Sequence, residues 1–544
     1  MSNKNVLSIV LNSHLPFIRH PELPFMYEEV PFFCTISETF IPLLLMLEEL
    51  ENENVPVKLG LVVSPVMCQM LTDKFLIQRY YAWLDRQISF GDNELKRTKN
   101  IPDVLQLAKF YRSMAINNKK LFKEKYKENI PEALAKYQKK GFIELICSTA
   151  TNCFLPFYQN KKEVVRAEIS TALESYRKYF HTDSKGIYFS ELGWDTELDQ
   201  YLKEFNLKWT MIETHGALLA DPPAKYGSFY PLSTNFGTNL LVKDFYAYRD
   251  IMDKETGIPF DPDFRDFYND AVDEPPLEDI RLFVNSKGIR IPTGFKYKTI
   301  GDAENKKTVY NRSVAHAKAK LMAERFLANR VESLKNASAE LAHDGDAGNK
   351  KLLSLCVWDA NFLGRFWYEG PVFLKNLFMI VSKSDDIEFM TPSAYLANES
   401  SADFQKVEPA FSSSCYNGYA EPFVDANNDW AARHIYRAVD RMTELAEHLP
   451  DETGIRERCL NQAAREVLLA LSSDWPRLMS EIHASSFSKW RSYSKTRLEG
   501  HLRNFTTIYE ILGGNILNTK FLTDLEQRDN IFPNIKYGIF KRKD

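Results

Sequence analysis

The chain has 544 residues, which at about 150 residues per domain predicts three or four domains, or one large barrel with additions. Hydrophobic residues make up 44% and charged residues 26%, so large cores can form and disorder over most of the length is excluded. A formal charge of -4 excludes the positive field of a protein that binds nucleic acid or anionic membranes, and it favours a neutral partner. The aromatic content of 13% admits a carbohydrate partner, although aromatic cores are the commoner explanation.

No targeting or membrane segment is evident in the sequence. The apolar run at residues 6–11 is short and is followed by no cleavage site, and no stretch approaches the roughly 18 apolar residues of a membrane span. The seven cysteines are scattered, without a CxxC pair or a metal-binding spacing. We therefore expect a cytoplasmic protein with reduced cysteines, no metal, no other cofactor and no membrane partner.

Short β-branched runs alternate with longer amphipathic stretches over the first half of the chain. The runs typical of buried parallel strands are residues 6–11, 57–63, 142–147, 186–189 and 209–212. The stretches between them predict helices at 38–51, 104–126 and 162–180. Strand and helix in repeated alternation predict an α/β fold, either a barrel or a doubly wound sheet.

The second half changes character twice. Residues 221–299 are rich in Pro, Gly, Asp and Tyr, which predicts a structured excursion near the active face. A helix at 313–334 and strands at 353–358 and 387–390 then bring the expected strands to seven. From residue 428 onward helices dominate, at 430–448, 455–471 and 487–512. We therefore expect a barrel over residues 1–300, an inserted helix and the end of the barrel over 301–400, and a helical domain over 401–544.

Polar residues that follow the predicted strands are the candidates for catalysis, because barrel active sites form at the carboxyl ends of the strands. Asn12 and His14 follow the first strand, Asn152 follows the third, and Glu191 and Asp359 follow two others. Two carboxylates that converge on one centre can cleave a glycosidic bond, one protonating the leaving oxygen and the other stabilising the sugar.

Each candidate also has a purely structural interpretation. Asp359 can cap the following turn or helix, and His14 can be a core histidine. Trp358 can belong to the core and need not be a sugar platform.

Most of the chain resembles glycoside hydrolase family 57, and within it the 1,4-α-glucan branching enzymes. The similar segments occur in order: LNSHLPFIRHPE, GFIELICSTATNCFLPFY, GIYFSELGW, GIRIPTGFKY, CVWDANFLGRFWYEGP, NDWAARHIYRA and LSSDWP. The resemblance implies an incomplete (β/α)7 barrel with an inserted helical region and a C-terminal helical domain. It also implies an α-1,4-glucan such as amylose or glycogen as the partner, and it leaves the oligomeric state open.

The resemblance also assigns roles to residues. Glu191 is expected to be the nucleophile of a retaining mechanism, and Asp359 the general acid and then the base. Gly294 and Asp474 fall in segments that match the branching group, and they are expected at the glucan, although Asp474 can instead cap a turn.

The chain departs from the family pattern around the reactive sugar. Asn12 and Asn152 stand where the family has His, Arg365 replaces a further His, and Ser414 replaces a Trp. Such changes remove transition-state contacts, and Arg365 is expected to lower the pKa of Asp359. Three functions remain open: an α-glucan branching enzyme with an altered subsite, a weak or inactive α-glucan-binding protein, and another hydrolase or transferase such as a 4-α-glucanotransferase. The excursion at 224–231 favours branching, and a metal-dependent deacetylase lacks its ligand set.

Overall fold

The structure, a computed structural model, describes residues 4–24, 27–253, 255–284, 288–302, 306–343, 350–481, 488–514 and 519–543. Its centre is a curled sheet in which seven strands run parallel in the order β7-β5-β4-β3-β2-β1-β8. These strands are β1 (Asn5–Ser13), β2 (Leu59–Val63), β3 (Ile143–Ser148), β4 (Gly186–Tyr188), β5 (Trp209–Ile212), β7 (Asn239–Val242) and β8 (Leu353–Asp359). The Asp244 N–H donates to the Leu355 carbonyl across 2.8 Å, which joins the end of β7 to β8. The expected incomplete (β/α)7 barrel is therefore confirmed.

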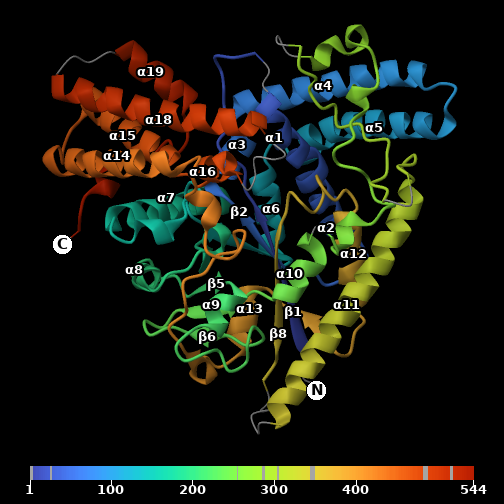
Figure 1. Cartoon of the computed structure of the whole chain (residues 1–544), viewed down its shortest axis with the longest axis horizontal. Helices are drawn as coiled ribbons and strands as arrows, with labels where there is room; N and C mark the ends of the chain where they lie inside the picture. The colour runs from blue at the N-terminus through green and yellow to red at the C-terminus, as the bar shows by residue number, and fades with distance from the viewer. Residues whose placement is uncertain are drawn as a thin grey trace.

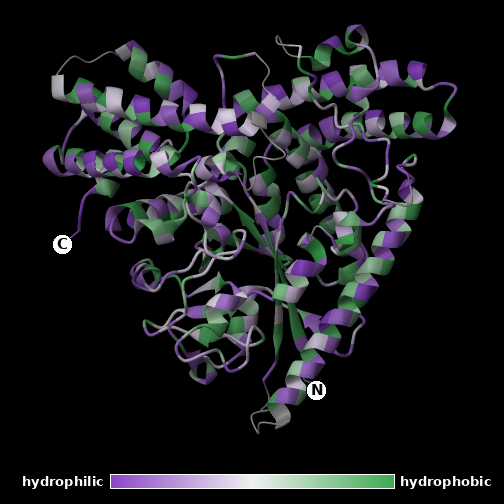
Figure 2. Cartoon of the chain, in the orientation of Figure 1, coloured by the Kyte–Doolittle hydropathy of each residue, from purple (hydrophilic) through white to green (hydrophobic). Residues whose placement is uncertain are grey.

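The two faces of the sheet support two separate cores, because side chains alternate along a strand. On β1, Val6 and Val10 belong to the core inside the curl, whereas Leu7, Ile9 and Leu11 pack outward against the helices. The central strands are almost uniformly hydrophobic in Figure 2, as expected for strands that are buried on both faces.

Helices surround the barrel in chain order. Between β1 and β3 these are α1 (Val30–Thr35), α2 (Ile41–Asn52), α3 (Pro65–Thr72), the long hairpin of α4 (Lys74–Arg97) and α5 (Pro102–Lys120), and α6 (Ile130–Lys139). Later come α7 (Lys162–Phe180), α8 (Asp199–Glu204), α9 (Thr214–Leu218), α10 (Phe245–Met252), α11 (Arg312–His343), α12 (Gly370–Val381) and α13 (Pro392–Asn398). The α4–α5 hairpin and the 32-residue α11 are the helical insertions, and both extend well beyond the sheet in Figure 1.

Two strand predictions need correction. The seventh parallel strand is β7, which falls inside the segment assigned to the excursion, and its four residues are too few to stand out from the surrounding Pro, Gly and Tyr. The predicted strand at 387–390 exists as β9 (Ile387–Phe389), but it pairs beside the first residues of β1 and is not one of the seven. The excursion also holds β6 (Leu232–Ser233), which forms an antiparallel hairpin with β7.

The C-terminal part is helical, with α14 (Asp429–His448), α15 (Gly454–Ala470), α16 (Asp474–Met479), α18 (Ser488–Gly514) and α19 (Thr519–Arg528). Residue 487, where the last helix was predicted to begin, lies outside the described residues. These helices pack beside one another at one end of the molecule, and α16 lies between them and the sheet (Figure 1). The short α16 therefore brings C-terminal residues to the barrel.

One helical run, Tyr27–Asn52, is long and apolar enough to cross a membrane by length and composition. Of its most apolar window, 83% is buried inside the protein. This burial is typical of a core helix, and α2 packs against α6 and α12.

Candidate active site

The carboxyl ends of the parallel strands meet at one edge of the barrel, and they carry polar side chains there. The residues of the inner core show which positions of each strand face inward. Since side chains alternate along a strand, every second residue after these positions also faces inward. This parity places a polar residue at or just beyond the end of five strands: Asn12, Ser64, Glu213, Lys243 and Asp359. Glu191 follows the end of β4 at the same edge.

Glu191 is held in a backbone turn that few residues adopt. It has φ +51° and ψ 32°, and the next residue, Leu192, also has a positive φ. Left-handed backbone at a residue other than glycine costs about 1–3 kcal/mol and persists only where the surroundings fix it. The turn is fixed by the Ser414 N–H, which donates to the Glu191 carbonyl at 2.6 Å, and by paired hydrogen bonds between Trp194 and Ser412.

The Glu191 carboxylate has two different oxygens. Oε1 accepts a hydrogen bond at 2.5 Å from Nη1 of Arg477, on α16, and Oε2 accepts a longer one at 3.3 Å from the Ser414 hydroxyl. The Glu191 charge is the largest of the influences that raise the pKa of Arg477. The charge-assisted bond thus occupies Oε1, whereas Oε2 makes only the longer contact and is the more available oxygen.

Asp359 differs from Glu191 in its electrostatics. The surrounding protein raises the pKa of Asp359 by desolvation, and the nearby Glu191 charge raises it further, against opposing effects from the Asn361 N–H and the Arg477 charge. The side chain nevertheless stays accessible to solvent. Oδ1 accepts from the Asn361 N–H at 2.7 Å, so Asp359 does cap a turn, but the next helix begins only at Gly370.

Arg365 forms no ion pair with Asp359, although the Asp359 charge is one of the influences that raise the pKa of Arg365. Its guanidinium has no ion pair among the described residues, and the rings of Phe366 and Phe267 lie 5.0 and 5.5 Å away. The pKa of Asp359 is raised, and Arg477 is the arginine that opposes this shift most strongly. The net pKa of Asp359 is therefore raised, opposite to the lowering expected from Arg365, because desolvation outweighs the nearby positive charges.

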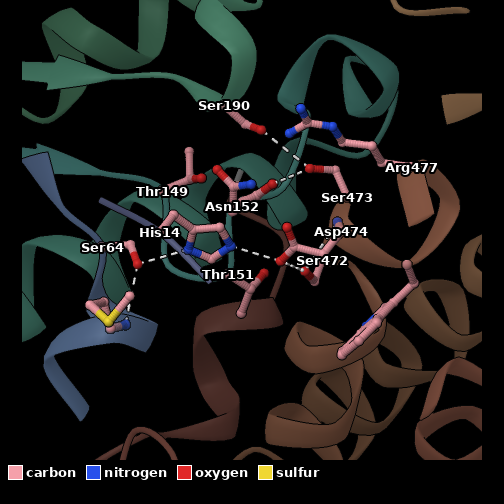
Figure 3. Close-up of polar contacts among 12 residues, drawn as sticks. His14, Ser64, Thr149, Thr151, Asn152, Ser190, Ser472, Ser473, Asp474 and Arg477 are labelled. Atoms are coloured by element: carbon pink, nitrogen blue, oxygen red, sulfur yellow. Dashed lines mark hydrogen bonds and ion pairs between the residues drawn. The ribbon is translucent and has the colours of Figure 1, made fainter. Parts of the chain in front are cut away.

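His14 and Asp474 join the barrel to the C-terminal helices. The His14 ring makes contacts of 2.8 Å to the Ser64 hydroxyl and 2.7 Å to Oδ2 of Asp474, and both side chains are less than a tenth exposed (Figure 3). Burial would raise the pKa of Asp474, but the His14 charge and hydrogen bonds from His14 and Ser472 outweigh it and lower the pKa. Both ring nitrogens of His14 therefore have polar partners, so it is not a lone core histidine. The contacts with Ser64 and Asp474 fix the orientation of its ring.

Asn152 lies beside this network, on the loop after β3. Its carbonyl accepts from the hydroxyl of Ser473, which also lies 3.2 Å from the Ser190 hydroxyl (Figure 3). The preceding Thr151 donates its N–H and hydroxyl to buried Glu168 at 2.9 and 2.6 Å. Burial raises the pKa of Glu168 to about 7, and the two hydrogen bonds from Thr151 fix the loop through this carboxyl.

Four residues of the site were not found in the sequence analysis: Glu213, Lys243, Tyr248 and Arg477. Glu213 and Lys243, at the ends of β5 and β7, form a buried ion pair, and the Lys243 ammonium lies 3.8 Å from the centre of the Tyr248 ring. The charges of Glu191 and Asp359 both raise the pKa of Tyr248, which places this ring near the two carboxylates. Glu213 could have been found, because it follows a predicted strand just as Glu191 does. Arg477 could not, because its position three residues after Asp474 gives no sign of a contact with Glu191.

Two residues predicted at the glucan have structural surroundings instead. Trp358 faces outward from β8, is 1% exposed, and donates its indole N–H to the Ala247 carbonyl, so the core alternative fits it. Gly294 adopts φ +82°, and its N–H donates to Asp270 at 3.0 Å. A side chain at this position would lie 2.8 Å from the amide of Gln87, so glycine is required for packing.

One group of side chains in the described part of the chain has the spacing to hold a metal: Glu466, His501 and Asp529, all buried in the C-terminal helices. The His501 ring lies 2.8 Å from Glu466, and Asp529 is paired with Arg497 and Arg528. Asp529 is balanced by two arginines, and Glu466 also accepts hydrogen bonds from the amides of Gln462 and Asn504, so the group does not require a metal.

A pair of carboxyl groups in different electrostatic surroundings at one edge of the barrel is typical of glycoside hydrolases. The profile of glycosyl hydrolase family 57 matches residues 8–408, and the C-terminal profile of 1,4-alpha-glucan branching enzyme matches residues 434–540. The chain belongs to glycosyl hydrolase family 57.

Individual relatives agree with this assignment. The 1,4-alpha-glucan branching enzyme TK1436 of Thermococcus kodakarensis is 26% identical over 570 aligned positions, which cover 98% of this chain and 78% of that enzyme. The crystal structure of the alpha-amylase AmyC from Thermotoga maritima matches with a TM-score of 0.90 at 30% identity, over 99% and 100% of the two chains. A branching enzyme of Pyrococcus horikoshii matches at 0.85 with 22% identity, over 99% and 97%, and supports the fold alone.

Proposed function

We propose that the protein is a retaining enzyme acting on α-1,4-glucans, of the branching type, with an altered sugar subsite. The observation that carries the proposal is the contrast between the two carboxyls: Glu191 is ion-paired with Arg477, whereas the surroundings of Asp359 raise its pKa. A nucleophile must be ionised and a general acid must hold its proton, so this contrast suits a retaining glycosidase.

In the first half-reaction, Asp359 donates its proton to the glycosidic oxygen while Oε2 of Glu191 attacks the anomeric carbon. The bond to the leaving chain breaks, and a glycosyl ester forms on Glu191. In the second half-reaction, the Asp359 carboxylate takes the proton of the acceptor hydroxyl, which attacks the anomeric carbon and releases Glu191. The 6-hydroxyl of a glucan as acceptor gives an α-1,6 branch, and water gives hydrolysis.

Branching is supported by the relatives that extend over the helical region. TK1436 is named a branching enzyme, and the profile at residues 434–540 carries the same description. That region supplies Arg477 and Asp474, the C-terminal side chains that contact Glu191 and His14. We infer that both helices and barrel are needed for the reaction.

Hydrolysis is the second candidate, because AmyC is described as an alpha-amylase and shares 30% identity over its full length. An inactive glucan-binding protein is less well supported. That alternative predicts Arg365 paired to Asp359, and no such pair exists in the described part of the chain. Seven free cysteines are compatible with the cytoplasmic location that we also propose.

The test is incubation with amylose, followed by measurement of α-1,6 linkages and of reducing ends on the same samples. Branching produces new α-1,6 linkages with few new reducing ends, and hydrolysis produces reducing ends alone. Glu191→Gln removes the nucleophile with little change in shape and is expected to abolish either product. Equal products from the variant and the unsubstituted protein would contradict the proposed mechanism.

A further inference from the structure

A pocket of about 380 Å³ lies apart from the two carboxylates, and we call it the hairpin pocket. It is lined by the segment after Glu191, by the turn of the β6–β7 hairpin and by a third segment before the Ser412 bridge. The residues that matter here are Trp194, Asp199, Asn235, Phe236 and Glu408. Trp194 lies three residues beyond Glu191, so the pocket and the nucleophile share one stretch of chain.

An exposed aromatic ring stands at the rim. Phe236 occupies the tip of the β6–β7 turn and is 54% exposed, which is unusual for a large apolar side chain. The Lys203 ammonium lies 5.9 Å from the ring centre and leaves much of the ring uncovered. An open ring beside a polar pocket is the arrangement on which the apolar face of a sugar stacks.

Two buried polar atoms in the wall have unused hydrogen-bonding capacity. Asp199 is 3% exposed, and its Oδ2 accepts from the Phe236 N–H at 3.2 Å, whereas its Oδ1 has no partner among the described residues. The indole N–H of Trp194, 1% exposed, also lacks one in that part of the chain. A buried polar group without a partner is destabilising, so a ligand that supplies a donor and an acceptor here is favoured.

The charge of the lining restricts the ligand class. Glu197, Asp199 and Glu408 contribute carboxylates, and Asn235 and Gln200 contribute amides. Carboxylates repel anionic ligands, whereas each hydroxyl of a neutral sugar can donate to Asp199 and accept from Trp194. A polyhydroxyl ligand with one apolar face satisfies the ring, the acceptor and the donor together.

We propose that the hairpin pocket is a second α-glucan-binding site, separate from the site at Glu191 and Asp359. The choice of α-glucan rests on the proposed function, and the choice of a neutral sugar rests on the pocket itself. Phe236 carries the stacking contact, and Asp199 and Trp194 bind hydroxyls after a small shift of the exposed turn at 235–237, since both atoms are shielded from water. A glucan held here stays attached to the enzyme between reactions.

The experiment measures the stoichiometry of maltoheptaose binding by calorimetry on the full-length Glu191→Gln protein, which cannot consume the ligand. We expect two equivalents to bind. Adding Phe236→Ala is expected to leave one equivalent, and adding Asp199→Asn is expected to weaken the second site at least tenfold. Leu321→Ala, an exposed apolar substitution on α11, serves as the matched control and is expected to keep both.

The outcomes separate this inference from the proposed function. One equivalent that disappears with Phe236→Ala supports the pocket and counts against glucan binding at Glu191. One equivalent that persists in Phe236→Ala, or two that persist in every variant, overturns the pocket. Phe236 is exposed, so its replacement tests the pocket even if Asp199→Asn fails to fold. Equal binding of a cello-oligosaccharide of similar length at the second site would overturn the assignment to α-glucan.

Discussion

At the scale of single residues, one arginine acts on both carboxyls. Arg477 contacts Glu191 directly, and its charge opposes the upward shift in the pKa of Asp359. It thus favours the ionised nucleophile while limiting how strongly the acid retains its proton. In the proposed mechanism this makes Arg477 a positioning residue.

Replacing Arg477 by alanine should therefore change the pH profile. We expect kcat/KM to fall about 10- to 100-fold, because the nucleophile loses its charge partner. The positive charge that lowers the pKa of Asp359 also disappears, so the basic limb of the profile should move to higher pH. The measurement is kcat/KM on maltooligosaccharides across pH.

Arg437→Ala, an exposed arginine on α14, is the control and should leave the profile in place. A uniform loss of activity in Arg477→Ala with no movement of the basic limb would show that Arg477 acts only on structure.

The two carboxylates could be found from the sequence because each directly follows a short hydrophobic run. Arg477 could not, since its contact with Glu191 joins residues 286 positions apart and depends on how α16 docks. Trp358 was wrongly expected at the glucan, because it belongs to a segment that resembles the family. Side chains alternate along β8, so Trp358 faces outward and its neighbour Asp359 faces inward.

At the scale of elements, the turn after β4 decides where Glu191 points. Gly193 ends this turn with an ordinary negative φ, so glycine is needed there for space and not for conformation. An added Cβ would lie 2.4 Å from the Phe154 ring, which is itself packed 4.8 Å from the ring of Phe423.

Gly193→Ala should therefore destabilise the protein by about 1–3 kcal/mol and displace the Glu191 turn. Urea unfolding gives the stability, and activity on maltooligosaccharides should fall more than the fraction unfolded explains. Gly513→Ala in α18 is the comparison: no atom among the described residues lies within 4 Å of its added Cβ, and a gain of about 0.5–1 kcal/mol is expected. Equal effects of the two substitutions would refute the crowding argument.

The positions of the strands were predictable from hydrophobic runs wherever a strand was long or flanked by clear helices. β7 was not predictable, because its four residues are too few to show the alternation typical of a strand. They form a strand because they pair with β5 and β6.

At the scale of the whole molecule, a second contact beyond His14 joins the barrel to the helical region. His20 follows the first strand, is 4% exposed, and lies 2.8 Å from the Tyr493 hydroxyl on α18. Burial and the Arg497 charge lower the pKa of His20 to about 4, so the docked histidine is neutral near pH 7.

The lowered pKa makes docking sensitive to acid. An unfolded histidine titrates near pH 6.5, so the unfolded state binds more protons between about pH 6.5 and 4, and stability falls as the pH is lowered through this window. The expected loss from this group is about 3 kcal/mol. His20→Gln should flatten this part of the curve of unfolding free energy against pH. An unchanged slope in the variant would assign the acid sensitivity to other groups.

The pairing of β1 also has a consequence for how the chain is made. β1 binds β2, which follows soon after, but its other edge pairs with β8, where Val6 meets Leu353. On the ribosome this apolar edge has no partner until most of the chain has been synthesised, and unpaired edges of this kind invite association between chains. We infer that the newly synthesised chain needs chaperones or slow synthesis to avoid association through this edge of β1.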